Sequence, residues 1–155
     1  MFTPLINLDG VCNCLSVRKA ARYLTAIYDK ALAPAGVRIT QFAILHKVTR
    51  IGPLSVKRLA AELAMDRTTV AANLKPLERE GLVHQVVDEK DRRARLIHIT
   101  EAGRHKLEQC LPLWAIAQTR FEEVYGSDRS RTMRDAMAHV LSKGFDAWVE
   151  EVAEK

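Results

Sequence analysis

Two short amphipathic segments that are separated by only a few residues constrain the fold of this chain more than any other feature. Ser55 precedes the first segment and Asp66 the second, and both residue types accept hydrogen bonds from the free amides at a helix start. Gly81 ends the second segment, as glycine commonly does at a helix C-terminus. After each cap, apolar residues recur at helical spacing: Val56, Leu59, Ala60 and Leu63 in the first segment, and Val70, Leu74 and Leu77 in the second. The pattern predicts a helix-turn-helix.

A β-hairpin is expected directly after these two helices. The segments 82–87 (LVHQVV) and 96–99 (LIHI) are short and rich in β-branched residues, and they flank the charged run DEKDRRAR. Two such strands around a polar tip are typical of a hairpin. A hairpin that follows a helix-turn-helix is a wing, so residues 37–100 are predicted to form a winged helix-turn-helix DNA-binding domain.

Long helices are expected on both sides of this domain. From residue 11 to residue 32 an apolar residue recurs every three or four positions, which predicts one long helix within residues 1–36. Thr40 is expected to cap the next helix, over residues 41–48. Residues 101–155 are predicted to form two further helices, the first capped by Thr100 and the second by Ser127 or Asp128.

The flanking helices carry more apolar surface than a small winged domain can cover. Their apolar residues at helical spacing are Val17, Ala21, Leu24, Tyr28 and Leu32, then Leu107, Leu111, Trp114, Phe121 and Tyr125, and finally Met133, Met137, Val140, Leu141, Phe145, Trp148 and Val152. A symmetric dimer interface would cover the surplus, so residues 1–36 and 101–155 are predicted to be dimerisation helices. The expected fold class is mainly α with a small β-hairpin wing: a winged helix-turn-helix plus a helical dimerisation region.

Composition and charge favour a soluble cytoplasmic protein with a polyanionic partner. No apolar run in the 155 residues approaches the roughly 18 needed to span a bilayer, and the first residues lack the layout of a secretory signal. Three cysteines do not predict a disulfide framework. The net charge is +5, and bases exceed acids by five in residues 1–54 and by two in residues 55–100. A nucleic acid is therefore expected to meet the first two thirds of the chain.

The second helix of the helix-turn-helix has a polar face that suits the major groove of DNA. Arginine pairs with guanine, asparagine with adenine, and threonine or alanine methyl groups with the methyl of thymine. The alternative is an ordinary solvated helix face. The candidate DNA-contacting residues of this helix are Arg67, Thr68, Thr69, Ala72, Asn73 and Lys75.

The tip of the predicted hairpin is a second candidate DNA contact. Asp91 is expected to hold Arg93 outward through a bidentate ion pair. An oriented arginine on a narrow ribbon fits the minor groove, where A–T-rich tracts concentrate negative potential. Alone, such a charged run is more often a solvated turn, but its place after a helix-turn-helix favours a DNA contact. The candidate residues of the tip are Asp91, Arg92, Arg93 and Arg95.

Residues 59–103 resemble the MarR family of winged-helix transcription regulators. The resemblance rests on LAAELAMDRTTVAANLKPLEREGLV and on DEKDRRARLIHITEAG, in which the D-x-x-D-R-R-A run is specific. It implies a homodimer that places two recognition helices and two wings on a pseudo-palindromic operator, with half-sites ~34 Å apart. It also places Arg92 and Arg93 at the family's basic wing-tip positions, and Asp91 at the acid that orients the wing arginine.

The resemblance further implies a signal that releases the protein from DNA. The more usual signal is a small aromatic or phenolic acid held in an apolar pocket between the dimer helices and the winged domain. Residues with suitable chemistry are Arg22, Tyr23, Tyr28, His46 and Trp114. A thiol switch is the alternative, because Cys14 resembles in position the reactive cysteine of hydroperoxide-sensing members and Tyr28 matches a tyrosine that assists it there. Otherwise Cys14 is a small packing residue.

Two other classes of function were weighed against a DNA-binding regulator. The sequence has no phosphate-binding loop, dinucleotide fingerprint, HExxH or GxSxG motif, so neither an enzyme activity nor a cofactor is expected. Cys12, Cys14 and Cys110 lack a further ligand pair, so no metal site is expected either. A winged helix that binds protein is the remaining alternative, although such a surface would favour exposed apolar anchors. The sequence therefore predicts a homodimeric, sequence-specific DNA-binding repressor that a small ligand releases.

Overall fold

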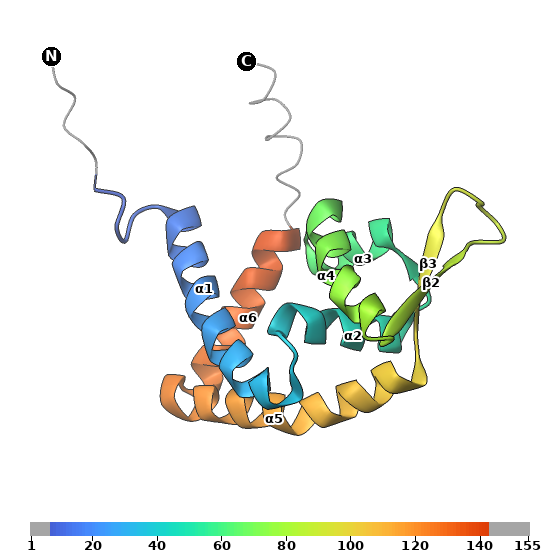
Figure 1. The fold of residues 1–155 in the computed structure, drawn as a ribbon. Coiled ribbons are helices and arrows are strands. Elements are labelled where there is room, and N and C mark those ends of the chain that lie inside the picture. Colours follow the sequence, from blue (N-terminus) through green and yellow to red (C-terminus); the bar gives the residue numbers. More distant parts are fainter. Residues whose placement is uncertain (1–6, 143–155) are drawn as a thin grey trace, which may run out of the picture. The chain divides into compact units, whose positions relative to one another are not determined.

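A computed structural model describes residues 7–142 of the chain, and Figure 1 shows its mainly helical fold. The elements are α1 (Asn13–Leu32), the 3-10 turn η1 (Ala33–Ala35), α2 (Ile39–Ile51), β1 (Leu54–Ser55), α3 (Val56–Leu63), α4 (Arg67–Arg79), β2 (Val83–Val87), β3 (Arg95–Ile99), α5 (Glu101–Tyr125) and α6 (Ser127–Ser142). The predicted class, mainly α with a small hairpin wing, is confirmed. Within the described range, no helix combines the length and apolar character needed to cross a membrane.

The chain divides into two compact units, and the boundary falls between Ala117 and Gln118, inside the continuous helix α5. The first unit contains the helix-turn-helix and the wing. Its core joins α2, α3, α4 and the sheet. The predicted inward-facing residues of the helix-turn-helix lie in this core, with Leu59, Ala60, Val70, Leu74 and Leu77 all buried.

Three of the predicted helix caps are confirmed. Ser55 caps helix α3, because its Oγ accepts a hydrogen bond from the Arg58 amide at 3.2 Å. The Thr100 hydroxyl oxygen accepts a bond from the Gly103 amide at 3.0 Å at the start of α5. Asp66 caps α4 in the same way. These bonds join residues three positions apart, which explains why local sequence patterns reveal them.

Two other predicted caps are wrong. Helix α2 begins at Ile39, so Thr40 lies inside it, and the Ile39 amide donates instead to Asp29 of α1 at 2.7 Å. Ser127 and Asp128 are the first two residues of α6, and the first helical carbonyl is that of Gly126, which accepts from the Ser130 amide at 2.9 Å. Glycine fits there because its φ is 102°, a left-handed value that side chains disfavour.

The small sheet has the strand order β1-β3-β2 and is antiparallel. Strands β2 and β3 form the predicted wing, which projects as a narrow hairpin in Figure 1. His84 lies opposite His98, and their rings stack with centroids 5.3 Å apart, as expected for a cross-strand pair. Strand β1 was not predicted, because two residues are too few to show an alternating pattern.

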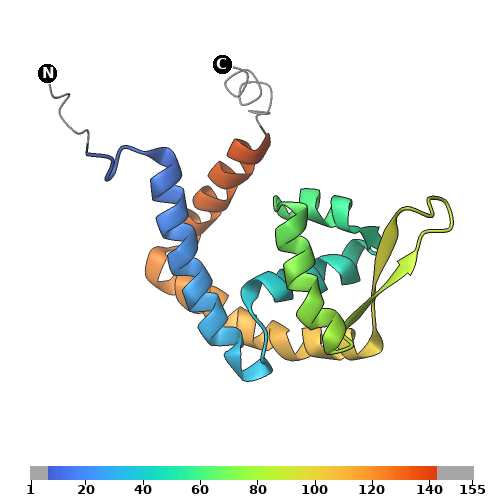
Figure 2. The same ribbon diagram turned by 45° about the horizontal axis from the view of Figure 1, so that its top comes forward.

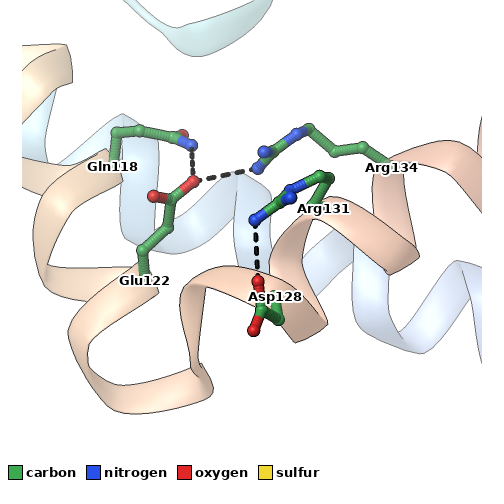
Figure 3. A network of polar contacts seen from close by, with 5 residues as sticks. All are labelled: Gln118, Glu122, Asp128, Arg131 and Arg134. Carbon is green, nitrogen blue, oxygen red and sulfur yellow. Dashed lines mark hydrogen bonds and ion pairs between the residues drawn. The ribbon is translucent and has the colours of Figure 1, made fainter.

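The second unit holds the end of α5 and helix α6, and Figure 3 shows polar contacts within and between these helices. The Glu122 Oε1 atom accepts from Gln118 Nε2 at 2.8 Å and from Arg134 Nη1 at 2.9 Å. Arg131 pairs with Asp128 at 2.7 Å within the first turn of α6. The Glu122–Arg134 pair therefore links α5 to α6 through one charge-assisted bond, whereas the Gln118 bond lies within α5.

Several predicted apolar residues of the last two helices are exposed to solvent in a single copy of the chain. Of the residues expected inside α5, Leu107 is buried, whereas Leu111 and Tyr125 are exposed. Met137, Val140 and Leu141 of α6 are also exposed. One copy of the chain therefore leaves part of the predicted apolar surface of these two helices uncovered. Phe145, Trp148 and Val152 lie outside the described residues.

Gly103 provides a test of the junction between the wing and α5. A Cβ added at Gly103 would strike the Leu82 carbonyl oxygen and come within 2.6 Å of Ile99 Cδ1. Although alanine usually favours a helix over glycine, we expect Gly103→Ala to lower the free energy of unfolding by about 1–3 kcal/mol, as overpacking does. Urea denaturation measures the change. The exposed Gln109→Ala is the control and should stay within about 0.5 kcal/mol of wild type; equal stability of the two variants would contradict the close approach.

Candidate nucleic-acid interface

The N-terminal half of α4 presents polar side chains to solvent. Its apolar stripe is buried in the core, and this fixes which face of the helix is free. Five of the predicted contact residues are exposed and Asn73 is half-buried: the exposed ones are Arg67, Thr68, Thr69, Ala72 and Lys75. Within residues 7–142, the side chains of Arg67 and Thr68 make no hydrogen bond or ion pair that would occupy them. Both remain available for an external partner.

The start of α4 is held by a doubly bonded cap. Asp66 accepts from the Thr69 amide at 2.8 Å and from the Thr69 hydroxyl at 2.7 Å. The hydroxyl bond is the largest cause that lowers the pKa of Asp66, followed by the amide bond. Because the folded-state pKa lies below the unfolded one, the cap stabilises the helix fully at neutral pH and is lost as pH falls through the folded-state pKa.

Asn73 is tied to the rest of the protein at both ends of its amide. Its Oδ1 accepts from the Thr40 hydroxyl of α2 at 3.2 Å, and its Nδ2 donates to the Thr69 carbonyl at 2.9 Å. The sequence predicted that Asn73 pairs with adenine, and these two bonds leave one Nδ2 hydrogen and one Oδ1 lone pair unused. Asn73 also links α4 to α2.

The wing tip is shaped by two aspartates that bind the backbone. Asp88 Oδ1 accepts from the Lys90 amide and Asp91 Oδ1 from the Arg93 amide, both at 3.0 Å. The expected ion pair of Asp91 with the Arg93 guanidinium is therefore replaced by a bond to the Arg93 backbone, which forms a turn typical of aspartate. Three arginine side chains of the tip, Arg92, Arg93 and Arg95, are exposed.

The wing and α4 are adjacent in the first unit. Strand β2 packs against α4, and the two lie side by side in both views (Figures 1 and 2). Gln85 of β2 donates from Nε2 to Glu78 Oε1 of α4 at 2.8 Å. The polar face of α4 and the arginines of the wing thus belong to one compact unit, as in proteins that place a helix and a wing on the same DNA site.

An open cavity of about 380 Å³ is lined by residues of α2, α3 and α5, all within the first unit. Phe42 stacks on His46 at 6.3 Å and on Trp114 at 6.2 Å between ring centroids. The remaining lining is mostly aliphatic; the lining residues are Ile39, Phe42, Ala43, His46, Lys47, Leu63, Leu111 and Trp114. We call this space the aromatic cavity.

Only two of the five predicted ligand residues, His46 and Trp114, line the aromatic cavity. Arg22 and Tyr23 are exposed on α1, and Tyr28 of the same helix does not line the cavity either. Sequence reasoning missed Phe42 and Lys47. Their spacing from His46 and Ile39 on α2 places them on one helix face, and this periodicity was the available signal.

The three cysteines lie in different environments. Cys12 caps α1, since its Sγ accepts from the Leu15 amide at 3.4 Å, and Cys14 is exposed in the first turn. Cys110 is buried in the core, and burial raises the pKa of its thiol. Across the described part of the chain, no three His, Cys, Asp or Glu side chains come together as a metal site.

The arrangement defines a class of protein. A helix-turn-helix whose second helix exposes arginine and threonine, beside a wing tipped with arginines, is the architecture of a winged-helix DNA-binding protein.

Comparison with known proteins narrows the class to a family. Residues 35–94 match the model of the MarR family. The M. tuberculosis transcriptional regulator MosR, solved in complex with DNA, is 34% identical with a TM-score of 0.77, over 88% of this chain and 98% of that one. The transcriptional activatory protein BadR of Rhodopseudomonas palustris is 33% identical over 111 residues, which cover 70% of this chain and 60% of BadR. The chain belongs to the MarR family of DNA-binding transcriptional regulators.

A more distant structure shares the fold alone. The PcaV transcriptional regulator of Streptomyces coelicolor, solved in complex with its natural ligand, is 19% identical with a TM-score of 0.78, over 92% of this chain and 99% of that chain.

The environments of the cysteines predict different reactivities. With a thiol-specific disulfide reagent at neutral pH, we expect Cys14 to react quickly and Cys110 to react only after unfolding, because the latter is buried and its thiolate is disfavoured. Stopped-flow absorbance with Cys14→Ser should show the loss of a fast phase. Cys110→Ser is the control and should keep every native-state phase; loss of a fast phase in that variant would contradict the prediction.

Proposed function

We propose that this chain is a homodimeric, sequence-specific regulator that represses transcription and leaves its operator when a small aromatic acid binds. The observation that carries the proposal is the capped, solvent-facing start of α4 beside an arginine-tipped wing on one scaffold. The similarity to MosR, which was solved in complex with DNA, supports the same use of this surface.

In the proposed complex the start of α4 enters the major groove. Arg67 and Thr68 contact base edges, because their side chains are free of internal bonds within the described residues. Asn73 holds α4 at its angle to α2 through the Thr40 bond. Thr69 and Ala72 complete the helix face that meets the bases, and Lys75 meets the phosphate backbone.

The wing in this proposal enters the adjacent minor groove. The Asp91 bond to the Arg93 backbone fixes the turn, so that the guanidinium groups of Arg92, Arg93 and Arg95 project from a narrow ribbon. Arginine is favoured in narrow minor grooves because the negative potential is enhanced there.

Two copies of the chain are proposed to pair through their flanking helices. Val124 is 90% and Leu141 72% exposed in the single chain, and neither exposure is expected of a protein that works alone. A two-fold dimer would bury such residues and present two α4 helices to successive turns of an operator.

The aromatic cavity is the proposed effector site. Its volume of about 380 Å³ suits a small aromatic molecule. Helix α2 lines this cavity with Ile39 and Phe42, and its Thr40 bonds to Asn73 of α4. A ligand that shifts α2 would therefore shift the recognition helix and change its spacing from the second copy. If the ligand releases the protein from DNA, the protein occupies its operator when no ligand is present. A repressor acts in this way.

Oxidation of Cys14 is the alternative signal, supported by its exposure in the first turn of α1. Release of bound DNA by hydroperoxide from the wild type, but not from Cys14→Ser, would favour it over an aromatic ligand. A protein-binding role would be favoured instead if no duplex selected from a random library resisted nonspecific competitor.

Two arginine variants test the DNA-binding surface. On a duplex selected from a random library, we expect Arg93→Ala to weaken binding to all sequences and to reduce the slope of log K against log salt by about one. Arg67→Ala should cost about 1–3 kcal/mol on the selected duplex and relax the preference for one base pair. Fluorescence anisotropy measures both. Arg120→Ala, exposed in the second unit, is the control, and an effect there equal to that of Arg93→Ala would refute the assignment.

The proposed dimer is tested at Val124. We expect Val124→Lys to raise the dimer dissociation constant at least about tenfold, because burying an ammonium in an apolar interface costs more than ~1.4 kcal/mol. Sedimentation equilibrium measures the constant. Glu123→Lys introduces the same side chain one position away and is the control. A wild-type chain that sediments as a monomer at micromolar concentration would exclude the dimer.

A further inference from the structure

One ion pair lies at the edge of the aromatic cavity and connects two helices. Lys47 of α2 lines the cavity, and its Nζ lies 3.3 Å from Glu62 Oε2 of α3. The pair is partly open to solvent, since 26% of the Lys47 side chain and 35% of the Glu62 side chain are exposed. Apart from His46, the other lining residues are aliphatic or aromatic.

A ligand anion that enters this cavity needs a cationic partner. Burying a carboxylate against apolar side chains is strongly unfavourable unless a hydrogen-bond donor of opposite charge meets it. Among the described residues that line the cavity, Lys47 alone carries an ammonium. An ammonium has three N–H donors, and its contact with Glu62 uses one of them.

We propose that Lys47 is the residue that selects for an anionic aromatic ligand, and that the ligand carboxylate displaces Glu62 from it. The inference rests on the proposed effector role of the aromatic cavity. Two carboxylates gathered at one ammonium repel each other, so the ligand and Glu62 compete for Lys47. A neutral ligand of the same shape leaves the ion pair intact.

The exchange gives the ligand charge a consequence for the DNA-binding domain. Glu62 lies on α3, the first helix of the helix-turn-helix, whereas Lys47 lies on α2. Displacement removes a polar link between these helices near the point where Leu63 meets the cavity. An anionic ligand therefore loosens the contact of α2 with the helix-turn-helix, while a neutral one only fills space.

The test compares 2-naphthoate with its neutral analogue 2-naphthamide by isothermal titration calorimetry on the full chain without DNA. Wild type should bind naphthoate more tightly. Lys47→Met should weaken naphthoate binding about tenfold, the worth of one charge-assisted hydrogen bond, and leave naphthamide within about twofold. Glu62→Gln should strengthen naphthoate binding about threefold or more, because the competing charge is gone, with naphthamide unchanged.

Matched controls distinguish an effect of side-chain charge on ligand affinity from a loss of folded protein. Lys57→Met removes an exposed α3 lysine that does not line the cavity, and it should leave both affinities at wild-type values. His46→Gln tests the second polar lining residue. Thermal unfolding of each variant establishes that it is folded, and a folded Glu62→Gln chain keeps the test decisive should Lys47→Met fail to fold.

Each other outcome overturns the inference in a distinguishable way. Equal wild-type affinity for the two probes, or loss of the preference in His46→Gln but not in Lys47→Met, removes Lys47 as the selecting residue and leaves the cavity as a ligand site. Unchanged naphthoate affinity in Glu62→Gln removes the competition. Absence of binding by either probe excludes the effector role along with the inference, while anisotropy with operator DNA tests the DNA-binding role separately.

Discussion

Burial of three helix faces in one apolar core is the constraint on which the rest of the structure depends. A helix as short as the 13-residue α4 is marginal in water by itself, so its stability comes from packing. Val70, Leu74 and Leu77 enter the core with Leu45 of α2 and Leu59 of α3. Once these residues are buried, the opposite face of α4 has to meet solvent, and Arg67 and Thr68 lie on it.

Helix α2 lies between the core of the helix-turn-helix and the aromatic cavity of the first unit. Its buried residues hold it in the core, and its outer face lines the aromatic cavity beside Trp114. Two side-chain contacts join the same helix to the helix-turn-helix, from Thr40 to Asn73 of α4 and from Lys47 to Glu62 of α3. A molecule in the cavity would thus act on both helices of the helix-turn-helix through one rigid element, in keeping with the discrete rearrangements of packed helices.

Hydrogen bonds hold the wing at its base and shape the turn at its tip. At its base, the Thr100 hydroxyl donates to the Gly81 carbonyl at 2.6 Å, and Gly103 lets α5 approach the Leu82 backbone. At its tip, Asp88 and Asp91 bind backbone amides and leave the arginines free. Acids that look like partners of basic side chains in the sequence therefore serve to shape the turn, and the positive charge remains available for a polyanion.

The sequence by itself determined the helix-turn-helix, its caps at Ser55 and Asp66, the wing strands and the exposed arginines, because these features depend on residues a few positions apart. Tertiary structure alone decided the features that join distant segments. These are the hydrogen bond of Asp29 to the start of α2, the hydrogen bond between Thr40 and Asn73, and the aromatic cavity. Periodicity states which face of a helix is apolar, but not which helix it meets. Hydrogen bonds across 10 or 33 residues depend on that packing, so no local pattern encodes them.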